Sequence, residues 1–359
     1  MTTTKPFLQF AIPTWNRQRE VEVCIRSIAS QITPEIRGVR ILVQDDCSTD
    51  QTKETIDALQ REYQDIIEYR CTPERKDYSV AFRNLFNSVD AEWVWTFGDD
   101  DRLEPDTLAR MLRVLKDSDL EFIHCAETGR ESGTGKLYKG SMIDLCNSFG
   151  WLDMTGFITC NIARGYIWNE AAKSPRLDLY AKSSFVQSCV LLELLRDKKC
   201  AYMDVPAIAT QNKDQTQECI DRWAVDKIGE RYMLVGDCIE AMFEAGILKS
   251  KLRRAFFRYQ NYHLWDRHIT YFLNDYTTRG VVVPDAWWES QKQLAGFLED
   301  EAFAGDLVSE IDRVRKGITV HRYMVARMCE IQDDIDEVCA RRGDSCYPWG
   351  YLVPRELAK

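Results

Sequence analysis

The first 125 residues alternate between short apolar runs and longer amphipathic segments, and this alternation limits the possible folds more than any other feature. The apolar runs have the length and the β-branched content of strands. The segments between them repeat apolar residues at helical spacing, as Val21, Cys24 and Ile28 do. A chain that alternates strands with helices forms a mostly parallel sheet with helices on both faces. We therefore expect strands over residues 7–12, 39–44, 66–70, 93–97 and 121–125, and helices over 18–31, 48–63, 79–89 and 105–115.

Two of the expected helices begin with recognisable signals. Ser48 and Gln51 have the spacing of a capping box, and Pro105 suits the first position of a helix. Beyond residue 125 the pattern predicts a Gly- and Ser-rich flexible excursion over 126–150, strand-like alternation over 155–168, a buried helix over 183–197 and a proline-interrupted strand over 200–210.

The periodicity changes near residue 215, where long helical segments rich in aromatic and charged residues begin. We therefore expect an α/β domain over residues 1–215 and an α-helical domain over 216–359, which would contact the acceptor, a membrane surface or another subunit. The segment 249–268 combines basic and aromatic side chains and suits a helix that can lie on an anionic membrane. The alternative, which we favour, is an amphipathic helix docked on the α/β domain, with its basic residues solvated or paired with acids.

Composition excludes several classes of protein. A formal net charge of −10 argues against a general nucleic-acid binder, which needs a basic surface. No apolar stretch reaches the roughly 18 residues of a transmembrane helix. The 13 cysteines are scattered and form no C-x-x-C pair, so zinc is not expected and the thiols favour a reducing cytoplasm.

Polar clusters follow three of the expected strands. They are PTWNR (13–17), DDCSTD (45–50) and GDDD (98–101). In a parallel α/β sheet, ligands bind beyond the carboxyl ends of the strands, so these clusters predict a binding site. The three adjacent carboxylates suit a divalent cation held against a diphosphate. The alternative for them is a solvated acidic turn before a helix, whose N-terminus favours acids.

The ordered set AIPTWNR, VQDDCSTD, AFRN and AEWVWTFGDDDRLEP resembles the inverting glycosyltransferases of family two over roughly residues 5–125. The resemblance implies a GT-A fold, which is a Rossmann-like, mostly parallel sheet flanked by helices. It also implies a nucleotide-diphosphate sugar donor and a Mn²⁺ or Mg²⁺ ion. The GDDD variant and the later GFITCNIARGYIW run look most like enzymes that build O-antigen, lipopolysaccharide-core or capsule glycans.

The resemblance assigns roles by position. The nucleotide-binding residues that it implies are Pro13, Thr14, Asn16, Arg17, Asp45 or Asp46 for the base, Arg83, Asn84 and Asp99. Two alignments of the acidic motif remain open. Aligned on RLEP, Gly98 takes the place of the family's first Asp and Asp100 is the metal ligand, with Asp99 recovering a ribose contact. Read as D-x-D, the pair is Asp99 and Asp101, and Asp101 is the ligand. We favour Asp100, with Asp101 next.

One element of the family pattern is missing. Relatives carry a Glu-Asp pair at the start of the helix expected near 185–196, where the Asp is the general base, and this chain reads SSFVQSC there. A base must lie within hydrogen-bond reach of the acceptor hydroxyl. Asp178 is our first candidate and Asp153 the second, although either fits a turn or a helix cap. His124 fits a satisfied buried histidine better than a base.

The expected protein is a cytoplasmic glycosyltransferase, in peripheral contact with the inner face of the membrane, that transfers a sugar to a glycan or lipid-linked acceptor in polysaccharide synthesis. Two alternatives stay open. A sugar-nucleotidyltransferase would need a Gly-rich loop after its first strand, and PTWNR has no glycine. A non-catalytic nucleotide-sugar sensor or scaffold would be consistent with the missing Glu-Asp pair.

Overall fold

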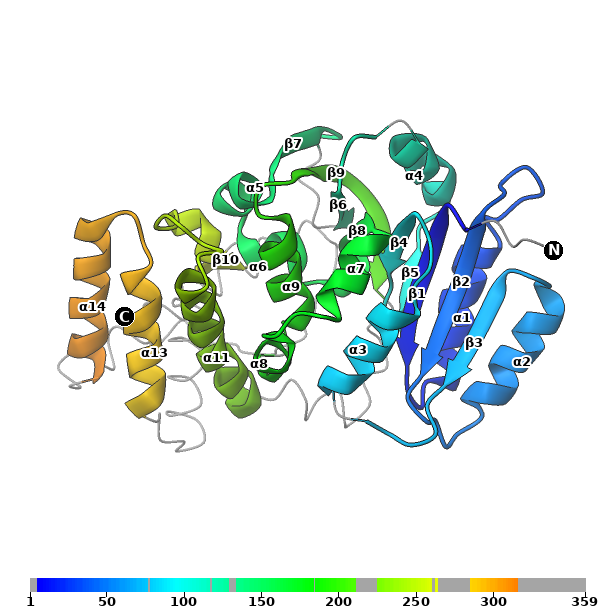
Figure 1. Ribbon diagram of the computed structural model, residues 1–359, viewed down its shortest axis with the longest axis horizontal. Helices are drawn as coiled ribbons and strands as arrows, with labels where there is room; N and C mark the ends of the chain where they lie inside the picture. Colours follow the sequence, from blue (N-terminus) through cyan, green and yellow to red (C-terminus); the bar gives the residue numbers. More distant parts are fainter. Residues whose placement is uncertain are drawn as a thin grey trace, which may run out of the picture. The chain divides into compact units, whose positions relative to one another are not determined.

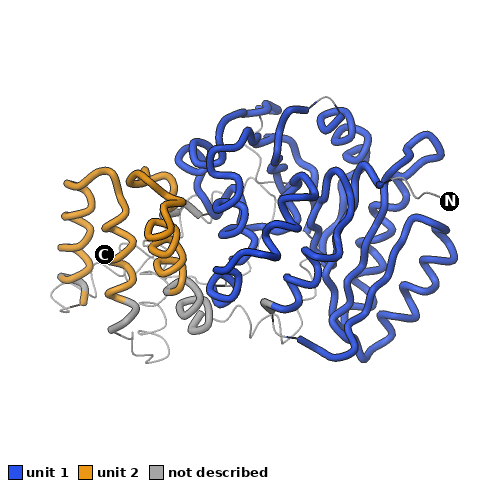
Figure 2. The backbone as a smooth tube through the Cα atoms, in the orientation of Figure 1, with its two compact units in different colours: residues 1–215 blue, residues 216–359 orange. Residues whose placement is uncertain are grey.

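The computed structural model describes residues 5–76, 78–116, 118–128, 134–183, 185–210, 225–259, 262–263 and 285–315. The chain is divided into two compact units, which are Met1–Gln215 and Thr216–Lys359 (Figure 2). The division falls in the region where the sequence pattern changes to helical periodicity.

A nine-stranded sheet forms the centre of the first unit (Figure 1). Its strands are β1 (Leu8–Thr14), β2 (Val39–Asp45), β3 (Ile67–Cys71), β4 (Trp93–Thr96), β5 (Asp101–Leu103), β6 (Phe122–Glu127), β7 (Leu137–Ser141), β8 (Asn161–Arg164) and β9 (Lys199–Thr210). The order is β3-β2-β1-β4-β8-β6-β9-β5, and β7 pairs with β9. Strands β1 to β4 are mutually parallel, as are β6 and β9, whereas β5, β7 and β8 pair antiparallel with their neighbours. The predicted α/β class with a mostly parallel sheet is confirmed.

Helices cover both faces of this sheet. They are α1 (Gln18–Ala29), α2 (Thr52–Glu62), α3 (Tyr78–Ser88), α4 (Thr107–Lys116), α5 (Met142–Phe149), α6 (Trp151–Thr155), α7 (Gly165–Ala171), α8 (Leu177–Lys182) and α9 (Val186–Leu195). The apolar sides of α1, α2 and α4 share one core with Phe10 and Trp95, whose rings stack. On the other face, Phe86 of α3 stacks on Trp168 of α7.

The N-terminus of α1 is capped by the loop that follows β2. The backbone N–H groups at residues 16, 17 and 18 donate to side chains of that loop and of the start of α2, which are Ser48, Thr52 and Asp50. The expected capping box is therefore wrong. Helix α2 begins at Thr52, four residues later than expected, because Ser48 is occupied with the neighbouring loop and with Asp45.

Three further sequence predictions need correction. The expected flexible excursion contains β7 and α5, while residues 129–133 lie outside the described part. The expected strand-like stretch 155–168 consists of a 3-10 turn (Ile158–Cys160), β8 and the start of α7. Helix α4 begins at Thr107, two residues after the proline expected to open it. By contrast, the buried helix expected over 183–197 is α9.

The described part of the second unit contains three helices. They are α11 (Val225–Glu244), α13 (Asp285–Gly296) and α14 (Glu301–Arg315). The helix expected over 249–268 is wrong where residues are described. There the chain forms a 3-10 turn (Arg254–Phe257) and a two-residue hairpin, β10 (Arg258–Tyr259) with β11 (Tyr262–His263). The cause is long-range pairing, since Leu252 exchanges backbone hydrogen bonds with Phe297 and Glu299.

Three of the basic side chains that the structure describes in this segment contact partners of their own unit. Lys251 pairs with Glu301 at 3.1 Å, Arg253 pairs with Glu299 at 3.6 Å, and Arg254 lies over the ring of Phe303. The two acidic partners agree with the pairing that the docked alternative expects, while docking on the α/β domain and contact with a membrane both stay predictions. No helix within the described residues is long and apolar enough to cross a membrane.

Candidate functional site

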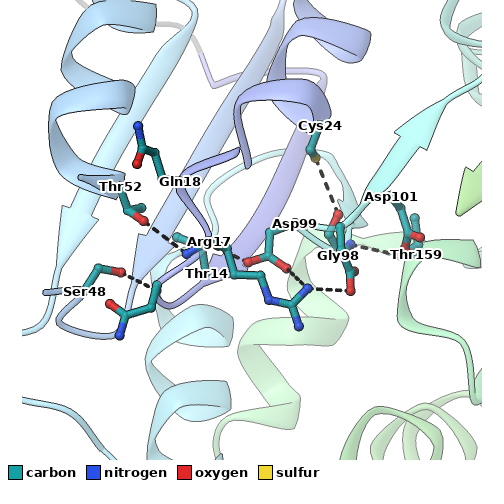
Figure 3. A network of polar contacts seen from close by, with 12 residues as sticks. Thr14, Arg17, Gln18, Cys24, Ser48, Thr52, Gly98, Asp99, Asp101 and Thr159 are labelled. Carbon is teal, nitrogen blue, oxygen red and sulfur yellow. Dashed lines mark hydrogen bonds and ion pairs between the residues drawn. The ribbon is translucent and has the colours of Figure 1, made fainter. Parts of the chain in front are cut away.

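Three loops meet where neighbouring parallel strands end. Strand β1 lies between β2 and β4, so the loops after these strands lie at the same edge of the sheet. Figure 3 shows Thr14 and Arg17 from the first loop, Ser48 from the second and Asp99 from the third close together. The structure thus brings the three polar clusters of the sequence to one place.

Asp99 is the buried carboxylate of the third loop. Its Oδ2 accepts a hydrogen bond of 2.8 Å from the Thr14 hydroxyl. Burial, followed by the charge of Asp100, raises the pKa of Asp99 to about 7, although the Arg17 guanidinium and the Thr14 bond oppose the shift. Desolvation disfavours a carboxylate charge, so this position needs a cation to stay ionised.

Asp100 faces solvent and meets a guanidinium. Its Oδ2 lies 2.6 Å from Nη1 of Arg17, and the same nitrogen lies 3.7 Å from Oδ1 of Asp99. The side chain of Asp100 is 40% exposed to solvent, whereas the side chain of Asp99 is 13% exposed. One cationic atom therefore lies within ion-pair distance of both carboxylates.

Asp101 is directed to a different partner. It opens β5 and is buried, and its Oδ2 accepts a hydrogen bond from the Thr159 hydroxyl. Thr159 Oγ1 in turn accepts the Gly98 N–H at 2.9 Å (Figure 3). Burial raises the pKa of Asp101 well above its usual range. Asp101 thus supports the acidic loop through the hydroxyl of Thr159, which also accepts the Gly98 N–H.

In the alignment on RLEP, Gly98 takes the place of the family's first Asp, and the packing around Gly98 leaves no room for a side chain. A Cβ at this position would lie 2.8 Å from Oδ2 of Asp101 and 2.9 Å from Oγ1 of Thr159. Real Cβ atoms do not approach so closely, so a side chain here would separate Asp101 from Thr159.

Asp45 supports the loop after β2. It is buried, and it accepts hydrogen bonds from the N–H of Ser48 at 2.9 Å, the Ser48 hydroxyl at 2.7 Å and the Tyr69 hydroxyl at 2.7 Å. These internal donors occupy both of its oxygens. Asp46 is the other residue expected to contact the nucleotide base, and the hydrogen bonds that it accepts within the protein are longer.

Asp46 lies beside a cation–aromatic pair at the edge of the site. It accepts the backbone N–H of Lys76 at 3.1 Å and the hydroxyl of Thr72 at 3.1 Å. Next to Lys76, the guanidinium of Arg75 lies 3.5 Å from the centre of the Trp15 ring. This edge therefore offers a flat aromatic surface, a carboxylate and positive charge, which are groups that suit a nucleotide.

Asn16 joins the first two loops. It has a positive φ of 50°, and its Oδ1 accepts the N–H of Thr49 at 2.7 Å. Pro13 pairs in register with Gln44 of β2. Pro13, in β1, and Asn16, in the loop after β1, therefore both lie at the edge of the site.

The remaining predicted residues form a second group. Arg83 of α3 donates to Asp178 of α8 at 2.9 Å, and Asn84 follows Arg83 on the same helix. Asp153 lies in α6. These residues lie on α3, α6 and α8, whereas Asp100 lies in the loop after β4. At the start of α9, Gln187 and Ser188 are buried where relatives place carboxylates, and Gln187 donates to the Gly156 carbonyl at 2.8 Å.

Sequence reasoning missed two residues of the site. Thr159 gave no signal beyond its place in the GFITC run. Glu127 ends β6 as a buried carboxylate, and its charge contributes to the raised pKa of Asp101. A carboxylate at the end of an apolar strand, as in EFIHCAE, was the available signal for it. His124, in the same strand, is buried and faces Asn161 at 3.5 Å, as expected of a satisfied histidine.

The pair Asp99 and Asp100 fits a divalent cation. Within the described residues, no three His, Cys, Asp or Glu side chains gather into a complete metal cage. Mg²⁺ typically needs only one or two carboxylates when substrate phosphates and water complete its shell. The two carboxylates already converge on one cationic atom of Arg17, so their oxygens are arranged for a positive charge.

The parallel strands with polar loops at their carboxyl ends, extended by antiparallel strands, define the GT-A glycosyltransferase fold. The crystal structure of S. aureus TarS 1-349 in complex with UDP-GlcNAc has this fold, with a TM-score of 0.57, 11% identity, and coverage of 87% of this chain and 92% of that one. In sequence, residues 10–171 match the model of the family described as glycosyl transferase family 2. Residues 10–171, somewhat less than half of the chain, are therefore similar to a family 2 glycosyltransferase domain.

Two named relatives share this domain. An abequosyltransferase, RfbV, from Salmonella typhimurium is 32% identical over 124 residues, which is 34% of this chain and 37% of that protein. A GalNAc(5)-diNAcBac-PP-undecaprenol beta-1,3-glucosyltransferase from Campylobacter jejuni is 28% identical over 140 residues, or 39% of this chain and 44% of that protein. The chain thus matches less than half the length of each relative.

Proposed function

We propose that this protein is a metal-dependent glycosyltransferase that moves a sugar from a nucleotide-diphosphate donor to an acceptor hydroxyl in bacterial surface-polysaccharide synthesis. The observation that carries the proposal is the convergence of Thr14, Arg17, Asp99 and Asp100 at the carboxyl ends of β1 and β4. The match to family 2 supports it, and the name of the Campylobacter jejuni relative, which includes PP-undecaprenol, favours a lipid-linked acceptor. Such an acceptor would place the enzyme at the inner face of the cell membrane.

In the proposed donor site, Asp99 and Asp100 hold the Mn²⁺ or Mg²⁺ ion. The ion supplies charge that stabilises the departing diphosphate. The edge formed by Trp15, Arg75 and Asp46 takes the nucleoside. Asp101, which the sequence offered as the next ligand after Asp100, is proposed instead as the brace of the loop.

The proposed displacement inverts the anomeric carbon, and a carboxylate removes the proton of the acceptor hydroxyl. Asp178 remains our first candidate for this base and Asp153 our second. The ion pair with Arg83 positions Asp178 on α8 beside α3. The side chains at the start of α9 cannot serve, because neither Gln187 nor Ser188 is a carboxylate.

The test is turnover by the purified protein with a panel of nucleotide sugars, Mn²⁺ and a lipid-linked saccharide. Asp100→Asn keeps the size of the side chain and removes one charge. We expect it to lower kcat/KM by at least about a hundredfold, as loss of one charge-stabilising group commonly does. Asp57→Asn, which removes an exposed carboxylate on α2, is the matched control and should be unchanged.

Asp178→Asn and Asp153→Asn in the same assay identify the base as the variant whose kcat falls while donor binding stays. Full activity of Asp100→Asn would refute the metal assignment. Nucleotide-sugar binding without transfer to any acceptor would favour the sensor alternative.

A further inference from the structure

The guanidinium of Arg17 lies within ion-pair distance of both Asp99 and Asp100. Its Nη1 is 2.6 Å from Asp100 and 3.7 Å from Asp99, and Asp99 is buried. Two adjacent carboxylates repel each other unless a cation offsets their charge. In the protein as it stands, an internal side chain supplies that cation.

Arg17 is fixed at its backbone and extended at its side chain. It precedes the first residue of α1, and its N–H donates to the Thr52 hydroxyl at 3.2 Å. From there the side chain reaches the loop after β4, 83 residues further along the sequence (Figure 3). A quarter of the side chain is exposed. The guanidinium can therefore turn toward solvent about its own side-chain bonds while the main chain of the loop stays in place.

We propose that Arg17 is an exchangeable counter-cation: it fills the cation position between Asp99 and Asp100 in the free protein and gives it up when a divalent ion arrives with a diphosphate. This inference rests on the proposed donor site. A metal ion alone must displace the guanidinium from two carboxylates. A diphosphate gives the displaced guanidinium a new anionic partner, since a guanidinium pairs well with phosphate oxygens.

The exchange couples the two ligands. Because the diphosphate draws Arg17 away from the carboxylates, it should strengthen binding of the metal beyond the direct contact between metal and phosphate. Linkage requires the metal to strengthen diphosphate binding by the same factor. Removing the guanidinium should then have an unusual effect: the free protein should bind metal more tightly after losing a residue of its own site.

The experiment is a titration of the nucleotide-free, full-length protein with MnCl₂, followed by the loss of the free Mn²⁺ signal in electron paramagnetic resonance. Arg17→Met keeps an apolar side chain of similar length without the charge. We expect its Mn²⁺ affinity to exceed that of the wild type by at least about fivefold, the lower end of typical coupling between sites. Adding UDP or GDP should then increase the Mn²⁺ affinity of the variant less than that of the wild type.

Arg26→Met is the matched control. Arg26 is on the same helix and pairs with Glu22 and Glu62, so its loss removes one positive charge without touching the loop. Its Mn²⁺ affinity should equal that of the wild type. In the double variant Arg17→Met/Asp100→Asn the gain should vanish, which places the ion at these carboxylates. Circular dichroism and thermal melting verify that each variant is folded.

Mn²⁺ binding by folded Arg17→Met that equals or falls below wild-type binding would overturn the proposal. Arg17→Lys provides a second reading if Arg17→Met does not fold, because a lysine keeps the charge without the planar fork and should give an intermediate affinity. Failure of the proposed function is recognised separately. In that case no nucleoside diphosphate binds the wild type with or without Mn²⁺, while the nucleotide-free titration still reports on Arg17.

Discussion

Three consecutive carboxylates in one loop have three different surroundings. Asp99 is buried against Thr14, Asp100 faces solvent beside Arg17, and Asp101 is enclosed with Thr159. Their positions in the sequence are equivalent, but their solvation and partners are not. Asp101 can therefore support the loop, while Asp99 and Asp100 direct oxygen atoms toward the Arg17 guanidinium.

The brace is testable at Thr159. Thr159→Val keeps the shape but removes the hydroxyl, which leaves the Gly98 N–H and the Asp101 carboxylate without this partner. A buried group left unsatisfied costs roughly 1–3 kcal/mol, so we expect a loss of about 1–3 kcal/mol in the free energy of unfolding. Urea denaturation followed by tryptophan fluorescence measures it.

Thr159→Ser retains the hydroxyl and should remain much closer to the wild type. An equal loss in both variants would mean that packing of the threonine methyl, rather than the two hydrogen bonds, holds the loop.

Protonation of His124, in strand β6, makes the free energy of unfolding depend on pH. Burial lowers the pKa of His124 to about 4 from its usual 6.5, although the hydrogen bond to Asn161 opposes the shift. Between these values the unfolded chain binds a proton that the folded chain does not. The free energy of unfolding should therefore fall by up to about 3 kcal/mol from pH 6.5 to pH 4, and this contribution should level off below pH 4.

Denaturation of the wild type and of His124→Asn over this pH range isolates that contribution. The raised pKa of Asp99 acts in the opposite direction, because the folded state then binds the extra proton, but this term is common to both proteins. Parallel pH profiles in the two proteins would show that His124 does not contribute.

The strands and helices of the first 125 residues were predictable because their signal is local. An apolar period of two or of 3.6 residues is visible within a window of ten, and most of the strands and helices between residues 7 and 125 show one or the other. Strand β5 was not predictable, since three residues carry almost no pattern and its partner β9 lies about a hundred positions later. The helix wrongly expected over 249–268 failed for the same reason, because Leu252 is held in place by residues 297 and 299.

The candidate site divides in the same way. That three polar clusters meet at one sheet edge follows from strand order, and sequence spacing reveals it. The partner of each carboxylate does not follow from spacing: Arg17 lies 83 positions from Asp100, and Thr159 lies 58 positions from Asp101. Only the folded chain shows which acids share a cation.

For the whole molecule, the proposed donor site predicts a nucleotide-specific gain in stability. A ligand that binds only the folded state stabilises it by about 2.7 kcal/mol at a hundred times its Kd. We expect one nucleoside diphosphate from a panel of UDP, GDP, CDP and ADP to raise Tm by a few degrees, and more with Mn²⁺ than with EDTA. Differential scanning fluorimetry measures the effect.

In Asp100→Asn the Mn²⁺-dependent part of this increase should disappear. Equal shifts for all four nucleotides, with no difference between Mn²⁺ and EDTA, would contradict a specific metal–nucleotide site.

The capping of α1 by the loop after β2 has a consequence for how such domains diversify. The N–H groups of residues 16–18 donate to three side chains of the segment 48–52, and Oδ1 of Asn16 accepts the N–H of Thr49 from that segment. A change of donor preference that remodels either loop alone would leave helix amides without acceptors. Exchange of loops between homologous enzymes, in nature or in chimeras, should therefore preserve function when residues 13–18 and 45–52 are transplanted as one cassette.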